Sequence, residues 1–327
     1  MSMKAIIIEK FGGPENLVIK DVVKPRPKKG EVTIAVKAFG LNHAEVHMRR
    51  GEWAEWVPIS GIECVGVVEA CPGGEFEVGS PVAAFMGGMG RSISGSYAQY
   101  TQVPITNVVS LGKGKLPLSW EKIAAIPESY STAWWSLFKN LEIKKGQTIL
   151  IRGGTSNLGQ AAINLAVDAG LDVTATSRKQ EKFGLLKSLG ANETVIEGPD
   201  LLERLPKKFD HVLNLVGNSV LLDSLKMLHR GGRLCHAGWL GGLEPLVDFN
   251  PLLQMASGVH FSMFGSFEFG KPEFLVSEIP LNSIIEKVAA GKFKADPYQV
   301  FDFEDIVEAH RVMESGKATG KLVVKVQ

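Results

Sequence analysis

The chain has 327 residues, of which 45% are hydrophobic and 22% charged, with a formal net charge of +1. This composition is typical of a globular enzyme large enough for two domains, and the near-zero charge argues against nucleic-acid binding. Its three cysteines form no paired framework, so we expect a reducing, cytoplasmic environment. We find no apolar run long enough for a signal peptide or membrane span, and expect neither.

Residues 1–120 consist of short apolar, β-branched runs separated by Gly, Pro and Lys clusters. This pattern indicates a partly open, barrel-like β domain, interrupted by a short helix at about Ala44–Arg50. The predicted strands are Lys4–Ile8, Leu17–Val23, Glu31–Phe39, Cys64–Ala70, Pro81–Phe85 and Tyr97–Val103.

Two histidines in the short helix raise the question of a metal site. His43 and His47 have i,i+4 spacing and would share one helix face. Two imidazoles need a third ligand to hold a metal, and Glu45 would point elsewhere on a helix. We therefore expect polar residues beside a cleft and no metal.

The stretch Thr148–Lys182 predicts a strand, a glycine-rich turn, a helix and a second strand. Thr148–Arg152 is apolar and β-branched, and helical spacing begins at Leu158. In the dinucleotide fingerprint, Gly154 and Gly159 hold the first and third glycine positions, and Ser156 holds the second. The hydroxyls of Thr155 and Ser156 and the amide of Asn157 could add donors. A turn of this kind at a helix N-terminus favours a pyrophosphate.

The residues after the second strand, Leu171–Thr176, indicate which cofactor the turn would bind. An NAD site usually has an acidic residue here, which accepts hydrogen bonds from the ribose. This chain has Ser177-Arg178-Lys179 instead. Because guanidinium binds a phosphate bidentately, whereas a carboxylate would repel it, the sequence favours NADPH over NADH.

The rest of the chain alternates helices and strands and then changes character. A helix at Ser131–Asn140 precedes the glycine turn, and Phe183–Leu189 is a further helix. These alternations predict a doubly wound parallel sheet of about six strands. Its remaining strands are Thr194–Ile196, His211–Val216, Arg233–Ala237 and Val259–Phe264. The last segments form a hairpin-like piece that we expect to return to the first domain. They are a helix Glu273–Ala290, a strand Tyr298–Phe301, a helix Phe303–Glu314 and a strand Lys321–Val326.

Several separated motifs resemble the zinc-free medium-chain dehydrogenase/reductases, close to the quinone oxidoreductase (ζ-crystallin-like) group. The resemblance covers nearly the whole chain. The motifs are Gly40-Leu41-Asn42 followed by Arg50-Gly51, Gly61-Ile62-Glu63 with Gly66, Gly95-Ser96-Tyr97-Ala98-Gln99-Tyr100, Ser131-Thr132-Ala133-Trp134, Leu215-Val216-Gly217 and Gly320-Lys321-Leu322-Val323.

The resemblance implies an α/β protein with a GroES-like catalytic domain, residues 1–120 and 268–327, and a Rossmann NADPH-binding domain, residues 121–267. It implies a homodimer that pairs the last Rossmann strand of each subunit. The 2′-phosphate would contact Ser177, Arg178 and Lys182. The nicotinamide half would be surrounded by Asn42, Thr132, Val216, Gly217, Trp239, Leu240, Phe264 and Ser266, with Lys321 reaching the cofactor and Leu158 completing the turn Gly154–Gly159.

The sequence differs from zinc-dependent members of the family at the zinc ligands, and this difference bears on the type of hydride acceptor. Zinc-dependent relatives carry a Cys ligand and a G-H-E histidine where this chain has Asn42 and Ile62. Without Lewis-acid help, an acceptor that spreads charge over a conjugated oxygen is the easier substrate. We therefore expect hydride transfer to a quinone or an α,β-unsaturated carbonyl, with Asn42 and Thr132 as hydrogen-bond donors and Trp53 in an apolar wall beside the acceptor.

Three other functions remain open from the sequence. The chain could reduce ordinary aldehydes or ketones without zinc. It could be an enoyl-thioester reductase, although Trp53 lies where such enzymes place a tyrosine proton donor, and indole cannot act as that acid. It could also be an NADPH-binding structural or regulatory protein without turnover.

Overall fold

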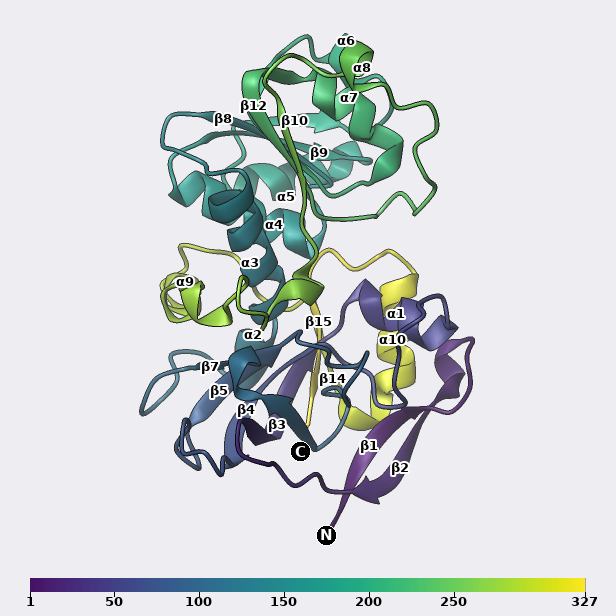
Figure 1. Ribbon diagram of the computed structural model, residues 1–327, viewed down its shortest axis with the longest axis vertical. Helices are drawn as coiled ribbons and strands as arrows, with labels where there is room; N and C mark the ends of the chain where they lie inside the picture. Colours follow the sequence, from purple (N-terminus) through teal and green to yellow (C-terminus); the bar gives the residue numbers. More distant parts are fainter. Residues whose placement is uncertain (327) are drawn as a thin grey trace. The chain divides into compact units, whose positions relative to one another are not determined.

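The computed structural model describes residues 1–326, and the chain divides into two compact units (Figure 1). One contains Met1–Ser131 and the chain from Ser266 onward, and the other is Thr132–Gly265. The sequence-based division placed residues 121–131 in the second unit. In the structure, helix α2 (Trp120–Ala124) packs on strands of the first unit, because it buries Ile123 and Ala124 there.

The first unit is built around a mainly antiparallel sheet, with strand order β14-β15-β3-β4-β5-β7 and with β6 paired to β3. A separate hairpin is formed by β1 and β2. The strands are β1 Ser2–Ile8, β2 Leu17–Val23, β3 Glu31–Gly40, β4 Glu63–Ala70, β5 Pro81–Phe85, β6 Tyr100–Pro104, β7 Val108–Ser110, β14 Gln299–Asp302 and β15 Leu322–Lys325. The helices of eight or more residues that lie wholly in this unit are α1 His43–Arg50, α9 Leu281–Ala289 and α10 Ile306–Glu314. This unit matches the expected GroES-like β domain.

The C-terminal segment returns to the first unit, as expected, but it is not a hairpin. Strand β14 pairs parallel with β15, and β15 pairs antiparallel with β3. Parallel neighbours need a crossover, and α10 provides it. The helix predicted at Glu273–Ala290 is also wrong in its first half. Helix α9 begins only at Leu281, because Pro280 lacks the N–H that a helix interior requires.

The second unit is a six-stranded parallel sheet with strand order β10-β9-β8-β11-β12-β13. This is the predicted doubly wound arrangement, and its order reverses between β8 and β11, where such sheets bind ligands. The elements are β8 Thr148–Arg152, α4 Asn157–Asp168, β9 Asp172–Ser177, α5 Phe183–Ser188, β10 Glu193–Ile196, α6 Leu201–Arg204, β11 Phe209–Asn214, α7 Leu221–Lys226, β12 Leu228–His236, α8 Pro251–Gln254 and β13 His260–Met263.

The helix predicted at Ser131–Asn140 begins earlier and changes type. Helix α3 spans Pro127–Trp134 and continues as a π-helical segment over Trp135–Asn140. Proline at its first position is compatible with a helix start, since that N–H has no intrahelical partner anyway. The segment leads to the turn before β8.

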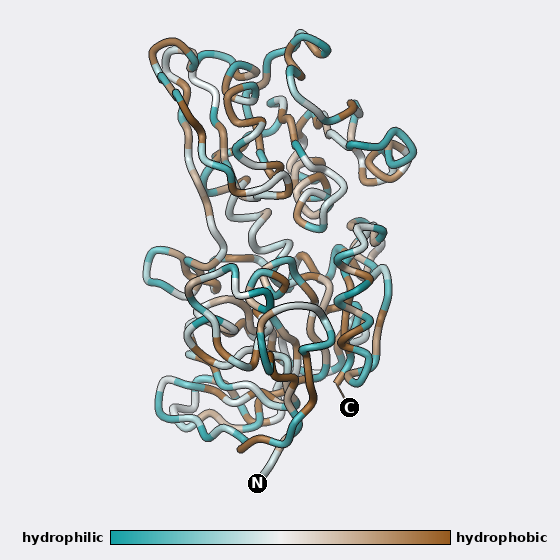
Figure 2. The backbone as a smooth tube through the Cα atoms, turned by 90° about the vertical axis from the view of Figure 1, so that its right-hand side faces the viewer, coloured by the Kyte–Doolittle hydropathy of each residue, from teal (hydrophilic) through white to brown (hydrophobic). Residues whose placement is uncertain are grey.

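The core of the second unit explains why its strands form. Leu150, Phe209, Val212 and Leu234 are almost fully buried and pack together under α6 and α7. Apolar stretches and hydrophilic turns alternate along the chain in both units (Figure 2). In the described part of the chain, no helix combines the length and hydrophobicity needed to cross a membrane.

Candidate functional site

The glycine-rich turn follows β8 at the carboxyl edge of the parallel sheet. Gly153 has φ of +84°, which favours glycine. A Cβ on Gly159 would lie 2.5 Å from the carbonyl oxygen of Gly153, so only glycine lets α4 start this close to the strand. These positions explain the fingerprint spacing of the turn.

The glycine-rich turn and the first turn of α4 leave backbone donors open. The N–H groups of Thr155, Asn157 and Leu158 have no acceptor among residues 1–326. The Ser156 hydroxyl is already engaged: it accepts from Gly159 N at 3.0 Å and donates to the Gly153 carbonyl at 2.9 Å. The suggestion that Ser156 donates to phosphate is therefore replaced by a capping role. The open N–H groups and the helix dipole are a suitable site for a pyrophosphate.

A buried ionic network at the ends of β8 and β9 holds the glycine-rich turn in place. Gly153 N donates to Thr176 Oγ1 at 3.0 Å, and Thr176 Oγ1 donates to Glu197. Arg152 is fully buried and pairs with Glu197 at 2.5 Å and with Asp223 at 2.6 Å. Each charge has a partner, as burial requires. The network ties the ends of β8 and β9 together and fixes the turn.

Arg178 follows β9 at the same edge and differs from Arg152. It is exposed and forms no ion pair with any described residue. Ser177, just before it, is buried, and its hydroxyl donates to Lys179 O at 3.1 Å. Lys182 lies in the following short 3-10 helix. No acidic residue ends β9, and the nearby carboxylate of Glu197 is neutralised by Arg152, so a 2′-phosphate would find the free guanidinium of Arg178 at the strand end.

Two further loops join the turn at this edge. Asn214 Oδ1 accepts from Val216 N at 3.0 Å and from Gly217 N at 3.1 Å. Leu240 N donates to Leu215 O at 3.2 Å, which ties the Trp239–Leu240 loop to the first. A Cβ at Gly153 would lie 3.0 Å from Leu240 Cδ1. The structure therefore gathers the glycine turn, Val216, Gly217 and Leu240 at one edge.

In the first unit, Asn42 lies in a cluster of buried charges. Lys321 Nζ contacts Glu63 Oε1 and Asn42 Oδ1, each at 2.5 Å. Asn42 Nδ2 donates to Glu63 Oε1 at 3.0 Å and has a longer contact, 3.4 Å, with Glu45 Oε1. We predicted that Lys321 reaches the cofactor, but here its ammonium is buried and shared between Glu63 and Asn42.

Glu45 completes this cluster from helix α1. Its carboxylate accepts from Asn42 N at 2.7 Å and from Ile62 N at 3.1 Å. The first contact is part of a capping box that starts α1. Complete burial raises the pKa of Glu45 to about 7, although Lys321 opposes the shift. The cluster therefore contains a carboxyl group that titrates near neutrality.

The remaining predicted residues are divided between the two units. Thr132 is buried in α3, and Phe264 stacks on Trp135 with ring centroids 6.2 Å apart; both belong to the second unit. Ser266 belongs to the first unit, where its hydroxyl donates to Glu128 at 3.1 Å. Trp53, also in the first unit, stacks on His47 with centroids 5.6 Å apart.

The histidines of α1 do not form a metal site with a third ligand. His47 Nδ1 instead contacts Glu52 at 2.5 Å. Within residues 1–326, no three His, Cys, Asp or Glu side chains are grouped in a way that could hold a metal ion. That the protein works without zinc remains a prediction.

The sequence did not reveal the residues that hold the site's loops and side chains in place through hydrogen bonds and ion pairs. Arg152 gave one signal, a charge that ends an otherwise apolar strand. Glu197 and Asn214 gave none: Glu197 acts through a contact with Arg152 made across the sheet, and Asn214 through a local turn in which it accepts from Gly217 N. Glu63 appeared in a motif, but its ion pair with Lys321 joins residues far apart in the sequence.

Comparison with known proteins agrees with this architecture. Residues 28–113 match the family described as alcohol dehydrogenase GroES-like domain, and residues 189–324 match that described as zinc-binding dehydrogenase. The quinone oxidoreductase of Homo sapiens is 28% identical over 337 residues, covering 98% of this chain and 97% of that protein. Among solved structures, an NAD-dependent alcohol dehydrogenase is 29% identical, and a mycobacterial protein complexed with NADPH is 25% identical. Each has a TM-score of 0.83 and covers 99% of this chain and 100% of the other.

Proposed function

The chain belongs to the medium-chain dehydrogenase/reductase family, whose members are pyridine-nucleotide-dependent oxidoreductases, and from this premise we propose that it is an NADPH-dependent reductase of quinones or conjugated enones. One observation carries the cofactor assignment. Open N–H groups at Thr155, Asn157 and Leu158 occur together with a guanidinium, that of Arg178, which has no ion-pair partner among the described residues. Both lie at the carboxyl edge of one parallel sheet.

The residues of the second unit fit a dinucleotide. The start of α4 would hold the pyrophosphate, and Arg178, helped by Ser177 and Lys182, would hold the 2′-phosphate. The Val216–Gly217 and Trp239–Leu240 loops would border the nicotinamide half. When bound, the reduced nicotinamide would supply a hydride. A relative complexed with NADPH and another described as NAD-dependent are similarly distant, so the preference for NADPH rests on Arg178.

The first unit would orient and polarise the acceptor through Asn42. One amide N–H of Asn42 is held by Glu63 at 3.0 Å, whereas the contact to Glu45 is long, at 3.4 Å. We propose that this weakly held second N–H leaves Glu45 and donates to a developing oxyanion. Lys321, at 2.5 Å from Asn42 Oδ1, polarises the amide and makes it a stronger donor. A single strengthened donor suits a conjugated acceptor, whose charge is already delocalised, better than a simple ketone. Water would supply the proton to the product.

Quinone relatives and the replacement of zinc ligands by Asn42 and Ile62 support this substrate class. The test is the loss of reduced-nicotinamide absorbance with a quinone and with a short enone, each with NADPH or NADH and with or without chelator. We expect turnover that prefers NADPH and is insensitive to chelator. Tight NADPH binding without turnover on either acceptor would favour the binding-only alternative. Activity lost with chelator would contradict the zinc-free assignment.

We also propose that the protein is a homodimer through β13. This strand is the last of its sheet and carries the exposed side chains of Phe261 and Met263, which are 42% and 55% accessible. An unpaired apolar edge strand invites pairing with a second copy. Light scattering after size exclusion should give twice the chain mass, and Phe261→Lys should shift the population to monomer. A monomeric parent protein would overturn this proposal.

A further inference from the structure

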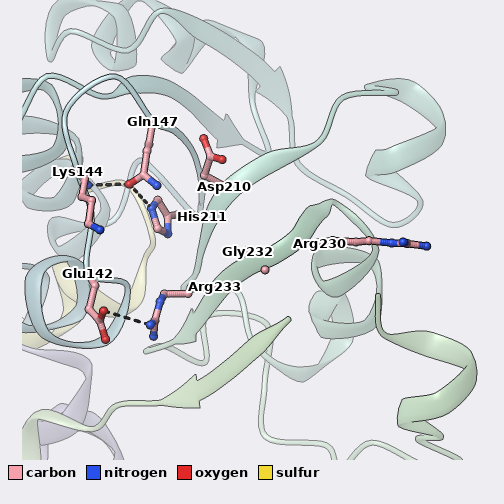
Figure 3. Close-up of a pocket in the computed structure, with 9 residues that line it drawn as sticks. Glu142, Lys144, Gln147, Asp210, His211, Arg230, Gly232 and Arg233 are labelled. Carbon is pink, nitrogen blue, oxygen red and sulfur yellow. Dashed lines mark hydrogen bonds and ion pairs between the residues drawn. The ribbon is translucent and has the colours of Figure 1, made fainter. Parts of the chain in front are cut away.

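A polar cavity of about 240 Å³ lies in the second unit at the amino ends of β8, β11 and β12. The glycine turn follows the carboxyl end of β8, so the cavity lies at the opposite edge of the sheet. Its lining residues come from the loop before β8, from the start of β11 and from β12 (Figure 3). Since a water molecule occupies about 30 Å³ in the liquid, the cavity has room for a small ion with several waters.

His211 lines this cavity and has one nitrogen without a hydrogen-bond partner among the described residues. Its side chain is buried, with 3% of the residue accessible, and Nδ1 has no partner among the described residues. The other nitrogen, Nε2, contacts Gln147 Oε1 at 2.8 Å. A buried polar atom without a partner is costly, and it indicates that something else satisfies it.

The tautomer of His211 follows from its neighbour. Gln147 Oε1 also accepts from Lys144 N at 2.7 Å, so the amide oxygen, not the nitrogen, faces the ring. Nε2 must therefore carry the proton and donate to Gln147. Burial lowers the pKa of His211 to about 4, so the ring is neutral at physiological pH. Nδ1 is then a bare lone pair, and its partner must be a hydrogen-bond donor.

The charges around the cavity indicate that this donor belongs to an anion. Lys144 and Arg233 both line the cavity, and within residues 1–326 Arg233 pairs with one carboxylate, that of Glu142, at 3.1 Å. The side chain of Glu142 is 56% exposed, so its ion pair with Arg233 is screened by solvent and a competing anion can displace it. Asp210 is a second lining carboxylate, held by Thr148 N and Oγ1, which donate to it at 2.8 and 2.9 Å. The lining still has more cationic side chains (Lys144, Arg230 and Arg233) than carboxylates (Glu142 and Asp210). Arg230 points away from the other side chains (Figure 3).

We propose that this cavity binds hydrogen phosphate, whose oxygens contact Arg233 and Lys144 and whose remaining P–OH group donates to Nδ1 of His211. Hydrogen phosphate combines the two required features, negative charge and a donor. Sulfate has the same tetrahedral shape and charge but carries no proton at neutral pH. The site therefore discriminates between two nearly identical ions.

Isothermal titration calorimetry of the intact protein with inorganic phosphate and with sulfate at neutral pH tests this proposal. The unmodified protein should bind phosphate at least about tenfold more tightly than sulfate, as expected for one lost buried hydrogen bond. His211→Phe should remove that preference, so that both ions bind equally weakly. Methyl phosphate, which is mostly dianionic at neutral pH, should bind like sulfate.

Matched variants separate this site from others. Lys144→Gln and Arg233→Gln should each lower the affinity for phosphate and for sulfate by about tenfold. Lys187→Gln, at an exposed lysine of α5, should change neither affinity. Lys144→Gln changes no buried group, so its result does not depend on His211→Phe folding. Equal affinity for phosphate and sulfate in the unmodified protein would overturn the proposal. Loss of phosphate binding in Arg178→Ala would also overturn it, since the phosphate would then occupy the proposed cofactor site.

Discussion

Charged residues in the two units are partnered in different ways. In the first unit, Glu63 and Lys321 are almost fully buried and pair with each other and with Asn42. Among the described residues of the second unit, Arg178 is exposed without an ion-pair partner, and the N–H groups of Thr155 in the turn and of two residues of α4 have no acceptor. Buried charges that are all paired stabilise the fold, whereas donors without acceptors at a sheet edge can bind a ligand. This difference supports our proposal that the first unit positions the acceptor and that the second binds the cofactor.

The buried pair of the first unit should produce the largest effect when broken. Lys321→Met leaves the carboxylate of Glu63 buried without its cation, and should lower the free energy of unfolding by about 3–5 kcal/mol. Lys20→Met, which breaks the exposed pair with Glu9, is the control and should cost less than about 1 kcal/mol. Chemical denaturation of both variants measures the difference.

Adding Glu63→Gln to Lys321→Met should recover much of the loss, because the unpaired charge is then removed. If Lys321→Met proved as mild as the surface control, the buried pair would not hold the scaffold.

The same cluster should make stability depend on pH through Glu45. Burial raises its pKa from 4.5 to about 7 in the folded protein. Between these values the unfolded chain releases the proton that the folded protein keeps, so stability falls as pH rises from 4.5 to about 7 and then levels off. The expected fall is on the order of 3 kcal/mol. Glu45→Gln should flatten the unfolding free energy over this window, and parallel pH curves for the two proteins would contradict the raised pKa.

The close approach of α4 to the turn is tested by a pair of glycine substitutions. Gly159→Ala would put a Cβ 2.5 Å from the Gly153 carbonyl and should cost about 1–3 kcal/mol and weaken cofactor binding. In contrast, the Cβ added by Gly184→Ala in α5 would meet no atom within 4 Å. This variant should raise the free energy of unfolding by up to about 1 kcal/mol. Thermal unfolding of the two variants should therefore move in opposite directions. A harmless Gly159→Ala would mean that the turn is less tightly packed than described.

Local patterns allowed much of the second unit to be predicted from sequence. The strand–turn–helix–strand at Thr148–Ser177 is set by neighbouring residues, and periodicity, glycines and the helix start all agree there. The six-strand parallel sheet followed from the same alternation. The Glu273–Ala290 prediction failed in its first half, because Pro280 interrupts any helix that would run through it.

The polar contacts of the site could not be predicted in the same way. Asn42 and Lys321 are 279 residues apart, and only the pairing of β15 with β3 brings their elements together. Residue type could suggest that Asn42 and Lys321 serve the site, but not that they bind each other. The capping role of Ser156 and the orphaned nitrogen of His211 likewise depend on hydrogen-bond geometry that spacing does not reveal.

The most direct test of the cofactor assignment is to titrate the protein and its Arg178→Ala variant with NADPH and with NADH and compare the dissociation constants. We expect the unmodified protein to bind NADPH more tightly than NADH. Arg178→Ala should weaken NADPH binding by at least about tenfold and leave NADH binding unchanged. Equal affinity for the two cofactors, or an equal loss of both in the variant, would contradict the cofactor assignment.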